Sequence, residues 1–281
     1  MNTHYLSPKI ESGALRMPDP FDRNAAANHL DIAAATMLQS ARSRLAAAAR
    51  WSAQQKGLAG ENPVYYGVPS QEPRAEETIG DMTHANLGGI VTRNHYGSLV
   101  LNAFRTLFMD VDFTPQDSAP GEVDGHNLPS WQTMLNDLCL VLKSEGDLGF
   151  RVYRTKAGFR MLATNREFEP GEPRVKELMN AVSADSDFVQ LCRIQNNFRA
   201  RLTPKPWRCG VKRPPSSFPR TSTAAERSFG QWLGRYERAC RDRATCQFLG
   251  HVGPHEMHLR IAPIIELHDR ETKALQSLPL A

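Results

Sequence analysis

Two aspartates occupy alternate positions near the end of an apolar segment, LFMDVDF at residues 107–113. A short apolar run with aromatic and β-branched residues predicts a strand, and side chains two positions apart share one face of a strand. Asp110 and Asp112 would therefore project together, beside an apolar layer. A divalent cation would balance their mutual repulsion, because hard oxygen ligands suit Mg2+ or Mn2+. The alternative is a strand end whose acids enter a turn or cap the next helix.

Strand and helix patterns follow one another along the chain. The alanine-rich residues 24–56 have helical spacing, whereas glycines and prolines interrupt residues 57–88, where only 64–68 has a strand pattern. We therefore predict an N-terminal helix and linker in residues 1–88, with the helix either packed on the core or mediating association, and an α+β core in residues 89–281. The core elements are predicted as strands at 90–94 and ending at 107–113, a helix at 130–143, hairpin strands at 150–154 and 159–164, helices at 174–182, 186–196 and 224–240, and a last strand at 257–267.

The predicted hairpin turn is rich in phosphate-binding groups. It lies within RTKAGFR, which contains Arg154, Thr155, Lys156 and Arg160. Cations, a hydroxyl and backbone amides can hold a phosphate, and Gly158 permits a close backbone approach. The alternative is an ordinary charged hairpin.

Positive charge is concentrated in the second half of the chain. The net charge of +4 divides into −5 for residues 1–140 and +9 for residues 141–281, and residues 193–243 hold 13 Lys or Arg against three acids. Such a segment either contacts phosphates or is compensated by acids elsewhere in the protein. A proline-rich excursion at about 198–222 interleaves cations with Phe198 and Trp207, a pattern suited to nucleic acid. Its candidate contact residues are Arg199, Arg201, Lys205 and Arg208, with a basic helix around 235–243 as a further candidate.

The apolar strand with Asp110 and Asp112, followed by a helix and the RTKAGFR hairpin, resembles the archaeo-eukaryotic primase and primase-polymerase superfamily. The resemblance implies an RRM-like core sheet with flanking helices, Mg2+ or Mn2+ held by the two aspartates, and nucleotide phosphates held at the hairpin. It also implies a third acid on a later strand, for which Glu266 is favoured slightly over Asp269. Arg160 stands where the family has histidine.

Cysteine usage and hydropathy bear on the location of the protein. Five cysteines without a CxxC pair predict neither a disulfide framework nor a zinc ribbon, which suits a reducing compartment. The first residues lack the apolar core of a signal peptide, and no run of about 18 apolar residues occurs. We therefore expect a cytoplasmic protein without a membrane partner.

Three functions agree with these features. The leading hypothesis is a divalent-metal-dependent nucleotidyltransferase, in which Asp110, Asp112 and Glu266 hold the metal and nucleoside triphosphates and nucleic acid are the substrates. The first alternative is a noncatalytic nucleic-acid-binding or assembly protein with a basic surface. The second is a metal-dependent nuclease or phosphodiesterase. The sequence does not distinguish DNA from RNA as the nucleic acid. It also leaves open whether a helicase or another protein is a partner.

Overall fold

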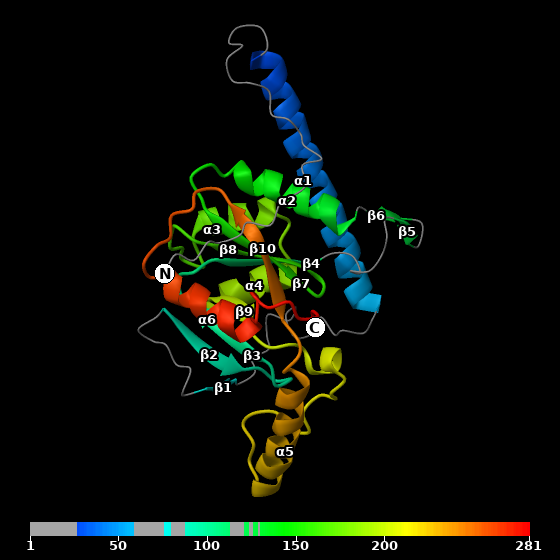
Figure 1. Ribbon diagram of the computed structural model, residues 1–281, viewed down its shortest axis with the longest axis vertical. Helices are drawn as coiled ribbons and strands as arrows, with labels where there is room; N and C mark the ends of the chain where they lie inside the picture. The colour runs from blue at the N-terminus through cyan, green and yellow to red at the C-terminus, as the bar shows by residue number, and fades with distance from the viewer. Residues whose placement is uncertain (1–26, 59–75, 80–87, 113–120, 124–125, 129) are drawn as a thin grey trace.

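The computed structural model describes residues 27–58, 76–79, 88–112, 121–123, 126–128 and 130–281. Within these residues the chain forms two four-stranded antiparallel sheets, a two-stranded ribbon and six α-helices (Figure 1). The predicted α+β class is confirmed. Helix α1 (Ala27–Leu58) extends beyond one end of the body and α5 (Thr223–Ala239) beyond the other.

The central sheet has the strand order β10-β7-β8-β4. All six residues of β8 (Gly158–Ala163) are buried, because helices cover both faces of this sheet. The predicted hairpin is confirmed, since β8 pairs with the preceding strand around a two-residue turn. The other strands are β4 (Phe108–Asp112), β7 (Phe150–Thr155) and β10 (Cys246–Val252).

Helices α1 and α2 (Trp131–Lys143) cover one side of the central sheet (Figure 1). The small side chains on the buried stripe of α1, including Ala41 and Ala48, allow close approach to α2. Arg44 of α1 donates two hydrogen bonds to the buried Asp137 of α2, at 2.7 and 2.5 Å. The predicted helix near the N-terminus is confirmed for its described residues, and it packs on the core.

Helix α5 rests on the second sheet through a small aromatic cluster. Phe229, Trp232 and Tyr236 recur at helical spacing and are buried, and the last two rings stack at 5.1 Å. Gly97 has a φ of +89°, and a Cβ there would lie 2.2 Å from the Trp232 ring. The turn before β3 therefore needs glycine for both its backbone and its contact with α5. The second sheet has the order β1-β2-β3-β9, formed by β1 (Glu77–Thr78), β2 (Gly89–Arg93), β3 (Leu99–Ala103) and β9 (Phe198–Arg201).

Two predicted strands are wrong. The long strand predicted to end at 107–113 is divided between two sheets, with β3 in one and β4 in the other. The last predicted strand, 257–267, is instead the loop before helix α6 (Ala262–Thr272) and most of that helix. Its buried residues follow helical spacing, and a proline in the first turn suits a helix start. These buried residues of α6 are Ile264, Ile265, Leu267, His268, Asp269 and Thr272.

The remaining elements lie between the strands and helices already described. The other predicted helices are confirmed to within a residue or two, whereas the strand predicted at 64–68 lies outside the described residues. No helix in the described part of the chain has the length and apolar character needed to cross a bilayer. The connecting elements are β5 (Gly121–Val123), β6 (His126–Leu128), α3 (Pro173–Ala181), α4 (Ser186–Gln195) and the 3-10 helix η4 (Pro206–Cys209).

Candidate functional site

A row of polar side chains crosses the central sheet on the face beneath α6. The strand register places Asp110 of β4 opposite Arg160 of β8, and Arg160 opposite Tyr153 of β7. Arg160 is 2% exposed and donates to both carboxylate oxygens of Asp110, from Nε at 2.7 Å and from Nη2 at 2.8 Å. Its Nη1 donates to the backbone oxygen of Arg201 at 2.9 Å. Burial lowers the pKa of Arg160, but Asp110 outweighs this effect and raises the pKa above its ordinary value.

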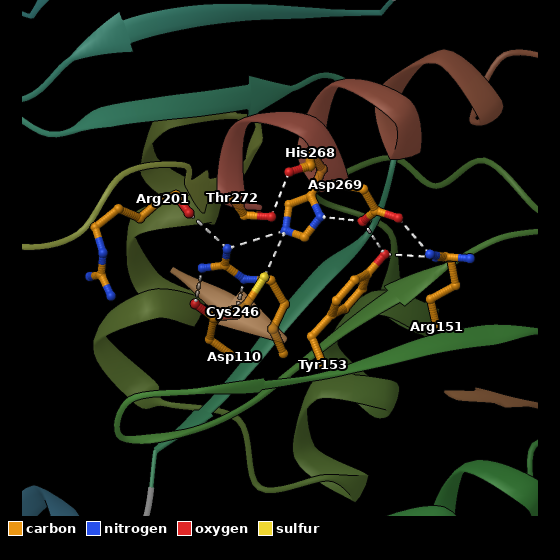
Figure 2. Close-up of polar contacts among 9 residues, drawn as sticks. Asp110, Arg151, Tyr153, Arg201, Cys246, His268, Asp269 and Thr272 are labelled. Atoms are coloured by element: carbon orange, nitrogen blue, oxygen red, sulfur yellow. Dashed lines mark hydrogen bonds and ion pairs between the residues drawn. The ribbon is translucent and has the colours of Figure 1, made fainter. Parts of the chain in front are cut away.

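Helix α6 completes the row from above (Figure 2). His268 is fully buried, with Nε2 3.4 Å from Nη1 of Arg160 and Nδ1 3.1 Å from Oδ1 of Asp269. Burial lowers the pKa of His268. We assign a neutral imidazole that carries its proton on Nδ1, because an arginine faces Nε2 and a carboxylate faces Nδ1.

Asp269 joins this histidine to two groups of β7. It accepts a hydrogen bond from the Tyr153 hydroxyl at 2.8 Å and one from Nη2 of Arg151 at 2.5 Å. Although burial raises the pKa of Asp269, the hydrogen bond from His268 and the charge of Arg151 hold it below its ordinary value. We refer to these residues as the buried charge network: Asp110, Arg151, Tyr153, Arg160, His268 and Asp269.

The buried charge network is electrically balanced. Each of its two carboxylates faces one guanidinium, and the histidine between the pairs is neutral. Both oxygens of Asp110 already accept hydrogen bonds from Arg160, so a metal would have to compete with this arginine for the carboxylate. Within the described residues, no group of three or more His, Cys, Asp or Glu side chains is arranged to hold a metal ion. The network as it stands is an internal ion-pair assembly.

The two proposed third acids, both on α6, differ in exposure. Glu266 is exposed, whereas Asp269 is 8% exposed and faces the sheet. Because the sequence pattern predicted a strand here, it did not identify His268, Tyr153 and Arg151 as residues of the site. The spacing of Ile261, Ile264, Ile265 and His268, together with Pro263, is the signal that identifies the helix.

The predicted phosphate-binding groups of the β7–β8 hairpin mostly contact other parts of the protein. Thr155 is buried, and the guanidinium of Arg154 lies 4.1 Å from the Trp131 ring centroid. Gly158 lies opposite Asp112, and a Cβ at this glycine would be 1.9 Å from the backbone oxygen of Val111. The close backbone approach expected at Gly158 is therefore to β4. Lys156 lies in the turn itself and is partly exposed.

The candidate nucleic-acid residues separate into two groups. Arg199 is buried and donates to Glu76 at 2.7 Å, to Gln195 at 2.6 Å and to Asn102 at 2.9 Å, so it is held inside the protein. The other three predicted cations are partly exposed: Arg201, Lys205 and Arg208.

An exposed tryptophan lies among these cations. Trp207 is 36% exposed, with Nζ of Lys205 5.5 Å and Cζ of Arg213 5.0 Å from its ring centroid. Its ring also meets the ring of Tyr96 edge-on at 5.4 Å. We refer to Trp207, Lys205 and Arg213 as the Trp207 platform.

Arginines line the outer side of the neighbouring helix. Because Phe229, Trp232 and Tyr236 face inward, α5 presents its other face to solvent, and η4 packs against this helix. The exposed cations recur at positions roughly opposite the buried aromatics. We refer to five exposed residues of α5 and the turn after it as the α5 arginine face: Arg227, Arg235, Arg238, Arg241 and Arg243.

Comparison of the chain with protein-family models, curated proteins and solved structures finds no match.

Proposed function

We propose that the protein binds nucleic acid without catalysing a reaction, through the Trp207 platform and the α5 arginine face. The observation that carries this proposal is the exposed Trp207 ring between Lys205 and Arg213. An aromatic face stacks on bases of any sequence, while neighbouring cations neutralise the phosphates. The five arginines of the adjoining face extend the cationic surface along α5, where they lie among the exposed acids Glu226, Glu237 and Asp242.

Single-stranded nucleic acid suits this surface better than a duplex. Bases stack on a side chain only where they are unpaired or splayed out. A second aromatic, Phe218, is 39% exposed in the same proline-rich excursion, with the guanidinium of Arg220 5.6 Å from its ring centroid. Because Arg220 is already paired with Glu77 and Glu226, Phe218 would provide a second stacking position rather than a second phosphate contact.

Binding of a labelled single-stranded oligonucleotide, followed by fluorescence anisotropy, tests the proposal. Trp207→Ala is expected to weaken binding by about 10- to 100-fold, because one stacked base contributes about 1–3 kcal/mol. Phe104→Ala is the matched control, since Phe104 is 39% exposed but lies outside the cationic excursion. Equal losses in both variants, or no binding by the unaltered protein, would contradict the proposal.

A metal-dependent nucleotidyltransferase with an RRM-like, primase-type fold is the second candidate. It is supported by the order β4-α2-β7-β8, with β8 between the other two strands, and by Asp110 and Asp112 at alternate positions of β4. On this proposal Asp110 and Asp112 would hold Mg2+ or Mn2+, in competition with the hydrogen bonds that Arg160 donates to Asp110. The ion would supply charge stabilisation for phosphoryl transfer.

A labelled primer incubated with Mn2+, with and without nucleoside triphosphates, separates the candidates. Extension of the primer that is lost in Asp112→Asn would support the nucleotidyltransferase, and shortening of the primer would support a nuclease. An unchanged primer that is nevertheless bound supports the noncatalytic proposal. Glu256→Gln, which changes an exposed acid outside the proposed metal site, serves as the matched control.

A further inference from the structure

Two cysteines meet where η4 contacts α5. Cys209 is the last residue of η4 and Cys240 caps the C-terminus of α5, and their Sγ atoms lie 3.9 Å apart. Both are free thiols. A disulfide needs an Sγ–Sγ distance of about 2.05 Å, so a shift of roughly 2 Å would join them.

The two thiols have unequal environments. Cys209 is partly exposed, and the hydrogen bond from Cys240, together with the charges of Arg243, Lys273 and Arg208, lowers its pKa to about 7 against the opposing effect of burial. Cys240 is 8% exposed, and its hydrogen bond to Cys209 and its burial raise its pKa. A partly exposed thiolate beside cations is the attacking partner in thiol–disulfide exchange.

The other three cysteines lack these features. Burial raises the pKa of Cys139 and brings the pKa of Cys192 and of Cys246 to about 12. Cys192 and Cys246 are 2% and 0% exposed. All five cysteines lie in the described part of the chain, and among them Cys209 has the environment of a reactive thiol.

We infer that Cys209 and Cys240 form a thiol–disulfide switch that is oxidised by low-molecular-weight disulfides and locks η4 against α5. The Cys209 thiolate attacks one sulfur of the small disulfide, forming a mixed disulfide and expelling one thiolate. Cys240 then gives up its proton and attacks Sγ of Cys209, expelling the second thiolate. The two protons lost by the cysteines pass to the two released thiolates, so one disulfide is reduced and one is formed.

The lock would act on the surface that the proposed function uses. Trp207 is two residues before Cys209 in η4, and Arg238 and Arg241 flank Cys240. Oxidation therefore fixes the Trp207 platform relative to the α5 arginine face. Formation of the disulfide itself is independent of the proposed function, because it is detected without any nucleic acid.

The test is oxidation of the reduced full chain by oxidised glutathione, followed by alkylation of free thiols, trypsin digestion and mass spectrometry. We expect a disulfide between peptides 209–212 and 239–241 that dithiothreitol reverses, with the buried Cys192 and Cys246 alkylated only after unfolding. The cross-link closes a loop between residues 31 apart in sequence, so the oxidised protein should melt about 5 °C higher.

Single variants test the order of the two steps. Cys240→Ser should retain glutathione on Cys209, since the resolving thiol is missing, whereas Cys209→Ser should leave Cys240 unmodified. Cys139→Ser is the matched control and should behave as the unaltered protein. Absence of the linked peptides in the oxidised protein, or a Cys240→Ser variant that takes up no glutathione at Cys209, would overturn the inference.

Discussion

The buried charge network and the basic surface both depend on arginine, yet they use it in opposite ways. Arg160 is 2% exposed and bound to Asp110 through two hydrogen bonds, whereas the five residues of the α5 arginine face are exposed. A buried ion must be paired and hydrogen-bonded, because removal from water costs several kcal/mol. An exposed ion costs little and stays available to a partner. Burial therefore separates the structural arginines from those suited to binding.

Ion pairs between the two halves of the chain offset part of its charge asymmetry. Three ion pairs join the halves: Asp110 with Arg160, Glu76 with Arg199, and Glu77 with Arg220. Among the described residues, acids of the first half thus compensate three cations of the basic half whose side chains are largely buried. The exposed arginines of α5 contribute to the remaining basic surface.

Loss of Arg160 should have the largest effect. Arg160→Met leaves the Asp110 carboxylate and the backbone oxygen of Arg201 without their buried donor, which should lower the free energy of unfolding by about 3–5 kcal/mol. Urea denaturation measures this loss. Arg213→Met, at an exposed cation, should change stability by less than about 0.5 kcal/mol. Similar losses in the two variants would remove the distinction between the regions.

The pairing of β4 with β8 is the next test, because it brings Asp110 to Arg160. Gly158→Ala places a Cβ 1.9 Å from the backbone oxygen of Val111, and the strands must separate to admit it. We expect a loss of about 3 kcal/mol in urea denaturation. Gly171→Ala is the control, since nothing lies within 4 Å of a Cβ there. A Gly158→Ala protein as stable as this control would contradict the strand register.

The pH dependence of stability tests the neutral histidine of the network. Burial lowers the pKa of His268 below the ordinary value of about 6.5, so below that pH the unfolded chain binds a proton that the native state does not. The free energy of unfolding is therefore unaffected by this proton above about pH 6.5. Below that pH it falls, by up to about 1.4 kcal/mol per pH unit. Urea midpoints at pH 7, 6 and 5 should therefore fall less steeply in His268→Gln.

Another histidine serves as a reference in the same titration. Burial and the neighbouring His255 lower the pKa of His251, to about 4, so His251→Gln should flatten the profile as well. Gln247→Asn, at an exposed residue without a titratable group, should leave the slope unchanged. An unaltered slope in His268→Gln would show that the native state binds a proton at this position.

Local sequence signals predicted much of the fold. Ser130 caps α2 by accepting a hydrogen bond from the backbone N–H of Thr133, and the hairpin around Lys156 follows from neighbouring residues. Helix α6 was missed because the adjacent isoleucines Ile264 and Ile265 suggest a strand, while helical burial depends on the sheet beneath. Local sequence patterns thus predicted helices and strands better than the contacts between them.

The site was harder to predict because its contacts span long stretches of chain. Asp110 and Arg160 were both selected from the sequence, but for a metal and a phosphate, and only the register of two strands shows them paired. Likewise the buried Arg199 is paired with Glu76, which is 123 residues away in the sequence. Residue type alone does not distinguish a buried ion pair from an open binding group.

The salt dependence of oligonucleotide affinity tests the central claim most directly. Each phosphate contact with a single strand contributes about 0.7 to the slope of log affinity against log salt, so the triple variant Arg235→Gln, Arg238→Gln, Arg241→Gln should reduce the slope by about 2. The control triple Lys176→Gln, Arg260→Gln, Arg270→Gln changes exposed cations at or beside α3 and α6 and should leave the slope unchanged. Binding that has the same slope in all three proteins, or that requires Mn2+ and Asp112, would contradict the account.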